Sequence, residues 1–74
     1  MPKAEIRNRI KALRFEHGEL TQAQLAERVG VTRQTIIALE AGKYVPSLAL
    51  ALNIARIFNQ PIETVFQLEE ENPN

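Results

Sequence analysis

The stretch that most constrains this chain runs from Gln22 to Gly42 and reads QAQLAERVGVTRQTIIALEAG. It contains two short helical patterns, about 22–29 and about 33–41, which are joined through a single glycine, Gly30. A glycine just past the last turn of a helix ends that helix in a left-handed conformation without a Cβ penalty. The apolar spacing on either side of Gly30 predicts that the two helices pack against each other at a steep angle.

The positions inside this stretch follow fixed offsets. Counted from Gln22, Ala26 is fifth, Gly30 ninth, Ile36 fifteenth and Leu39 eighteenth. A methyl group at Ala26 allows the two helix axes to approach closely, and apolar side chains close a small core between them. This spacing is typical of a DNA-binding helix-turn-helix. A helical hairpin without any DNA role shows part of the same pattern and remains the alternative.

Composition limits the other function classes. The 74 residues allow one domain, with no cysteine for disulfides or thiolate metal sites. The chain has no aspartate, a single histidine (His17) and no glycine-rich phosphate loop, so we expect no metal site, no cofactor and no enzyme active site. No apolar run reaches the ~20 residues of a membrane span, and the N-terminus lacks a signal peptide's apolar segment, so we expect a cytoplasmic protein.

The net charge of zero hides a polarised chain. Residues 1–44 hold eight Lys or Arg and five Glu, whereas residues 45–74 hold one Arg and four Glu. The helix-turn-helix pattern therefore lies in the basic part, as expected for a nucleic-acid binder.

The rest of the chain predicts an all-α fold of five helices, with Thr21, Thr32 and Ser47 as N-caps. The helices are expected at about 6–17, 22–29, 33–41, 48–58 and 62–65. Residues 65–68 fit a short strand as an alternative. We expect one helix-turn-helix domain over residues 1–69, with the motif at 22–41, and a disordered acidic tail over residues 70–74.

A helical wheel divides the second helix of the motif into two faces. Ile36, Leu39 and Glu40 share one side, and Gln34, Ile37, Ala38 and Ala41 lie opposite. In a major groove, Gln34 could read an adenine edge, Ile37 and Ala38 could touch thymine methyl groups, and Arg33 could reach a guanine or a phosphate. Lys43 and Tyr44 follow this helix directly, where phosphate contacts are reasonable. For Ile37 and Ala38, ordinary scattered surface positions remain the alternative.

The segments LTQAQLA, GVTRQTI, ALEAGKYVPSL and ALNIARIF resemble the Cro/repressor-type (Xre-like) helix-turn-helix family from about Arg9 to Phe66. The resemblance implies a five-helix, lambda-repressor-like DNA-binding domain. By position it also implies that Gln22 touches phosphate, that the groove is lined by Thr32, Arg33, Gln34, Thr35 and Ala38, and that Arg14 and Glu40 form an ion pair. In small stand-alone members a C-terminal strand pairs with an N-terminal one, which would place residues 4–7 beside residues 65–68. The helical pattern of residues 6–17 competes with that strand.

The sequence thus predicts a transcriptional regulator, a repressor acting as a homodimer on a pseudo-palindromic operator in double-stranded DNA. The helix at 48–58 is apolar nearly all round, so part of its surface needs cover from outside the domain. We expect the dimer interface at Leu50, Ile57, Ile62, Val65 and Phe66. The competing interpretation is an antitoxin-like or adaptor module that binds a protein partner through the same helices and binds DNA only secondarily.

Overall fold

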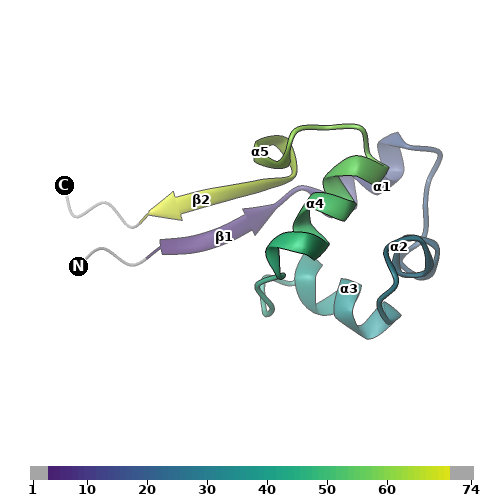
Figure 1. The fold of residues 1–74 in the computed structure, drawn as a ribbon, viewed down its shortest axis with the longest axis horizontal. Coiled ribbons are helices and arrows are strands. Elements are labelled where there is room, and N and C mark those ends of the chain that lie inside the picture. The colour runs from purple at the N-terminus through teal and green to yellow at the C-terminus, as the bar shows by residue number, and fades with distance from the viewer. Residues whose placement is uncertain (1–3, 71–74) are drawn as a thin grey trace.

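The computed structural model describes residues 4–70, which form five helices and a two-stranded antiparallel sheet (Figure 1). In chain order the elements are β1 Ala4–Asn8, α1 Ile10–Glu16, α2 Gln22–Val29, α3 Arg33–Glu40, α4 Leu48–Ile57, α5 Ile62–Val65 and β2 Phe66–Glu70. The predicted all-α, five-helix architecture is confirmed, and so is the pairing of the terminal segments into a short sheet. None of the described helices has the length and apolar character needed to cross a membrane.

All five helices contribute to one core. The fully buried side chains are Ile10, Leu13, Leu25, Ile36, Leu39, Ile54, Phe58 and Val65. Leu25, Ile36 and Leu39 are therefore in the core between α2 and α3, as their spacing predicts, and Val29 packs against it half-buried.

Short polar side chains cap the starts of α2, α3 and α4. Thr21 accepts a hydrogen bond from the backbone N–H of Gln24, whose side chain accepts one from the N–H of Thr21, which completes a capping box. The hydroxyls of Thr32 and Ser47 likewise accept hydrogen bonds from the backbone N–H groups of Thr35 in α3 and Leu50 in α4. All three predicted N-caps are confirmed, and each satisfies a backbone donor that the helix itself leaves unpaired.

The predicted helix at 6–17 is wrong at its start. Residues 4–8 form β1, and α1 begins only at Ile10. The backbone of β1 pairs with β2 in the register Ile6↔Leu68 and Asn8↔Phe66, and the N–H of Arg9 donates to the carbonyl of Val65 at 2.9 Å. Strand pairing thus supplies partners for backbone groups that a helix would have satisfied internally.

We call β1 and β2 together the ribbon; it projects from the helical body (Figure 1). Residues directly opposite each other share a face, so Ile6 and Leu68 lie side by side and both are exposed. The other face carries an ion pair between Arg7 and Glu69. Glu70, expected to begin the tail, is the last residue of β2, and residues 71–74 lie outside the described residues.

Candidate nucleic-acid interface

The turn between α2 and α3 sets the angle of the two helices. Gly30 has a φ of 75°, and the N–H of Val31 donates to the carbonyl of Ala26 at 3.0 Å. Ala26 is only 3% exposed, so its methyl group occupies the contact between the helices where a larger side chain would separate them. The predicted role of each of these positions matches its place in the structure.

The outer face of α3 is open to solvent. Ile36 and Leu39 point into the core, with exposures of 0% and 1%. Arg33 and Gln34 are exposed in the first turn, and Thr35, Ile37 and Ala38 are half-buried along the same helix. One short helix therefore presents a cation, an amide and small apolar groups outward, while its inner side is held by the core.

Two threonines at the start of α3 are joined to each other. The Oγ1 atoms of Thr32 and Thr35 lie 3.1 Å apart, and the N–H of Thr35 donates to Thr32 Oγ1 at 3.2 Å. Thr32 is exposed and Thr35 half-buried. This pair fixes the backbone that carries Arg33 and Gln34.

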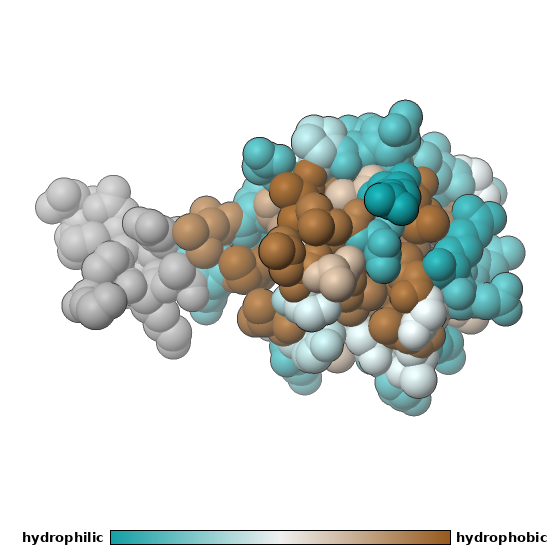
Figure 2. Space-filling view, in the orientation of Figure 1, coloured by the Kyte–Doolittle hydropathy of each residue, from teal (hydrophilic) through white to brown (hydrophobic). Residues whose placement is uncertain are grey.

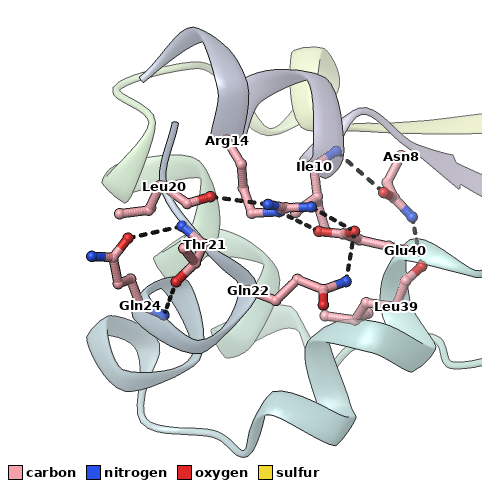
Figure 3. A network of polar contacts seen from close by, with 9 residues as sticks. All are labelled: Asn8, Ile10, Arg14, Leu20, Thr21, Gln22, Gln24, Leu39 and Glu40. Atoms are coloured by element: carbon pink, nitrogen blue, oxygen red, sulfur yellow. Dashed lines mark hydrogen bonds and ion pairs between the residues drawn. The ribbon is translucent and has the colours of Figure 1, made fainter. Parts of the chain in front are cut away.

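The C-terminal turn of α3 is anchored by a buried ion pair (Figure 3). Arg14 donates from Nε to Glu40 Oε2 at 2.6 Å and from Nη2 to Glu40 Oε1 at 3.0 Å, and its Nη1 reaches the carbonyl of Leu20 at 2.9 Å. Only 8% of the Arg14 side chain and 9% of the Glu40 side chain are exposed. A two-point contact of this kind fixes orientation as well as distance between α1 and α3.

Gln22 belongs to the same network. Its Nε2 donates to Glu40 Oε1 at 3.1 Å, so the amide at the start of α2 is oriented by the end of α3 (Figure 3). The amide retains a second N–H that can serve an outside acceptor. Lys43 and Tyr44 are exposed in the loop that follows α3.

The sequence of this chain is similar to those of known regulators. Residues 10–65 match the helix-turn-helix family. The uncharacterized HTH-type transcriptional regulator YgzD of Bacillus subtilis (strain 168) is 54% identical over 67 residues, which cover 90% of this chain and 100% of that protein. An uncharacterized HTH-type transcriptional regulator of Methanothermobacter thermautotrophicus is 58% identical (89% of this chain, 96% of that protein), and MJ0272 of Methanocaldococcus jannaschii, described in the same words, is 50% identical (89% and 98%).

The chain belongs to the Xre-like helix-turn-helix family. This family consists of DNA-binding transcriptional regulators and is not an enzyme class. The α2–α3 unit is accordingly its helix-turn-helix, and α3 is the second helix of the unit, the position that is called the recognition helix in such motifs.

Sequence reasoning missed one residue that contacts this helix-turn-helix unit from β1. Asn8 donates from Nδ2 to the carbonyl of Leu39, in the last turn of the recognition helix, at 2.8 Å. Its Oδ1 accepts from the N–H of Ile10 at 3.2 Å (Figure 3). An asparagine just ahead of an apolar helical pattern is a capping signal that could have placed the start of α1 after Asn8.

The apolar residues expected at a dimer interface divide into two groups. Leu50 and Val65 are buried in the core of the helix-turn-helix domain, with exposures of 7% and 0%, so their side chains are unavailable to a partner. Ile57, Ile62 and Phe66 are half-buried against that core. The large apolar side chains that are open instead include Leu48 and Leu52 on α4 and Ile6 and Leu68 on the ribbon.

Proposed function

We propose that this protein is a sequence-specific transcriptional repressor that binds a pseudo-palindromic operator as a homodimer in the cytoplasm. The observation that carries the proposal is the recognition helix α3, whose inner side is fixed by the core and by Arg14 while Arg33 and Gln34 face solvent. A helix held in this way can enter a major groove with its first turn toward the base edges.

The proposed contacts follow from the chemistry of the exposed groups. Arg33 suits a guanine edge or a phosphate, and Gln34 suits an adenine edge. The methyl groups of Ile37 and Ala38 suit thymine, while Thr32 and Thr35 line the groove. Backbone phosphates are assigned to Gln22, Lys43 and Tyr44, which flank the recognition helix.

A second copy is proposed because one recognition helix reads too few base pairs for a specific site. The open apolar side chains Leu48, Leu52, Ile6 and Leu68 offer a surface for it, which we call the α4–ribbon surface. Figure 2 shows hydrophobic residues gathered over the centre of this face and continuing onto the base of the ribbon. Ile57, Ile62 and Phe66 remain candidates for its edge, because they are only half-buried.

Repression is proposed to arise from occupancy of the operator. The YgzD match spans that relative completely, so a regulator of this family can consist of little more than the domain described above. A dimer seated across a promoter needs no further activity to exclude competing proteins.

The experiment is selection of binding sites from random duplexes at a stated salt concentration. We expect a two-fold symmetric site with half-sites about 10 base pairs apart. Arg33→Ala combined with Gln34→Ala should lower operator affinity at least 100-fold, because each good base contact contributes about 1–3 kcal/mol of discrimination. Lys11→Ala, at an exposed position of α1 away from the proposed DNA and dimer surfaces, is the control. Unchanged affinity in the Arg33/Gln34 variant would overturn the proposal.

A further inference from the structure

The side chain of Asn8 connects β1 to both α1 and α3. It lies at the end of β1, its Oδ1 accepts the first N–H of α1, and its Nδ2 donates to the carbonyl of Leu39 in the last turn of α3. The same carbonyl accepts the N–H of Gly42 at 3.0 Å, so both of its acceptor positions are occupied. The recognition helix is thus attached to the ribbon by a single side chain at one end.

Away from Asn8 the ribbon and the recognition helix are separated by solvent. An open groove of about 520 Å³ lies between β1 and the segment that follows α3, with Ile6 on one side and Tyr44 and Val45 on the other. Among the side-chain hydrogen bonds of residues 4–70, the Asn8–Leu39 contact is the one that joins the ribbon to α3.

The ribbon also exposes apolar side chains that a partner could cover. A two-stranded sheet alone is marginal in water, and Ile6 and Leu68 leave an apolar cross-strand pair exposed by 36% and 62%. Asn8 lies two residues from Ile6 on the same face of β1, because side chains alternate along a strand. Any contact that fixes the Ile6–Leu68 pair therefore also fixes the strand that carries Asn8.

We propose that Asn8 is a positioning residue that couples pairing of two copies at the ribbon to DNA binding by α3. This inference rests on the homodimer of the proposed function. When a second copy holds the ribbon, Asn8 transmits that fixed position to the carbonyl of Leu39 and restricts the angle of the recognition helix. Without a second copy the ribbon moves more freely, and the same hydrogen bond restricts α3 less.

The test uses a variant that removes one of the two contacts of Asn8. Asn8→Asp keeps an oxygen for the N–H of Ile10 and adds negative charge at the start of α1, which a helix N-terminus favours. It loses the donor to Leu39 and sets a carboxylate against that carbonyl. Asn53→Asp, at an exposed position of α4, adds the same charge without this contact and is the control.

Each variant is measured in two backgrounds, the wild-type protein and Leu68→Glu, which places a charge on the exposed apolar pair. Sedimentation establishes the oligomeric state of each, circular dichroism establishes folding, and all are titrated on the same selected operator duplex at low salt. We expect Asn8→Asp to lower operator affinity about 10- to 100-fold in the dimeric background, because each of the two copies loses a hydrogen bond that accounts for about 3- to 10-fold, and less than about twofold in the Leu68→Glu monomer. Asn53→Asp should change affinity less than about twofold in both.

The outcomes separate the inference from the function on which it rests. An equal loss of affinity in both backgrounds would mean that Asn8 acts only on the fold or through its charge. No loss of affinity would mean that Asn8 does not act on α3. Either result overturns the coupling and leaves the dimeric regulator intact. A wild-type protein that stays monomeric on the operator overturns the proposed homodimer, and the coupling with it.

Discussion

At the scale of single residues, the side chains that hold α3 in place are distinct from those that we propose contact DNA. Among the described residues, Arg14 is the charged side chain that lies in the core, at 7% exposure, and its partner Glu40 sits on the inner side of α3. Arg33 and Gln34 lie one to two turns earlier on the same helix and are open to solvent. The ion pair therefore sets orientation, while the exposed pair remains free to make intermolecular contacts.

Removing Arg14 tests this assignment. Arg14→Met keeps the aliphatic bulk but leaves the Glu40 carboxylate buried without a cation, so the free energy of unfolding in urea should fall by about 3–5 kcal/mol. Arg9→Met is the control, because Arg9 and Glu16 are 3.7 Å apart and both about half exposed, and such pairs contribute about 0–1 kcal/mol. Adding Glu40→Leu to Arg14→Met should recover most of the loss, since no buried charge remains. Equal losses for Arg9→Met and Arg14→Met would contradict the assignment.

Lys43 allows a phosphate contact to be distinguished from a base contact. Lys43→Gln should weaken binding to operator and to unrelated duplexes by a similar factor and reduce the slope of log K against log salt by about 1.8 for the dimer, about 0.9 for each copy. Lys11→Gln, on the exposed side of α1, should leave that slope unchanged. Filter-binding titrations at four salt concentrations measure both variants. A loss confined to the operator would instead assign Lys43 to a base edge.

At the scale of elements, a single residue, Gly30, determines how α2 connects to α3. Gly30 combines a left-handed backbone with open space, since a Cβ built there would meet nothing within 4 Å. The α2–α3 connection therefore depends on the backbone conformation of one residue and not on room for a side chain.

Substitution at Gly30 separates these two effects. Gly30→Ala should lower the free energy of unfolding by about 1–2 kcal/mol, the cost of a left-handed conformation for a residue with a Cβ. Gly30→Asn should cost less, because asparagine tolerates that region. Urea denaturation gives both values. If alanine were tolerated without loss while asparagine was not, the backbone explanation would fail.

The sequence predicts the elements whose determinants are local. The bounds of α2 and α5 agree with their predicted ranges, because Thr21 and Pro61 stand directly before their first residues. The pattern of Ile6 and Ile10 fits a helix equally well, but residues 4–8 pair with β2 at the opposite end of the chain, and no local spacing carries that information. For α4, which is apolar nearly all round, the sequence leaves open which side the core covers, and only the structure shows that Leu50 faces the core.

Local and long-range determinants also differ at the candidate nucleic-acid interface. The outward position of Arg33 and Gln34 follows from the helical period of α3 alone. The contact between Gln22 and Glu40 and that between Asn8 and Leu39 join residues far apart in the sequence, so only the packed fold brings them together. Sequence reasoning therefore identified the helix that faces outward and, through the family resemblance, the Arg14–Glu40 pair at its far end, but not the contacts that Asn8 and Gln22 make there.

At the scale of the whole molecule, the apolar surface and the recognition helix occupy different parts of the domain. Figure 2 shows hydrophobic residues gathered on the face toward the viewer, where α4 lies, whereas α3 lies along the lower edge of the same view in Figure 1. A second copy seated on this surface would leave both recognition helices uncovered. Exposed apolar surface of this kind is otherwise a liability in water.

Leu52→Glu tests the proposed pairing at a site on α4, separate from the ribbon. Leu52 is 50% exposed, so a carboxylate there should be solvated in the monomer and change the free energy of unfolding by less than about 1 kcal/mol. In a dimer the same carboxylate would be desolvated within an apolar contact, which is costly without a partner. Sedimentation at micromolar concentration should therefore show dimers for the wild type and monomers for Leu52→Glu. The control is Ala12→Glu, which adds the same charge on the exposed side of α1 and should remain dimeric. The Leu52→Glu monomer should bind a single half-site duplex as wild type does but lose its preference for the full operator. If Leu52→Glu remained dimeric, the second copy would have to be placed on another face of the domain.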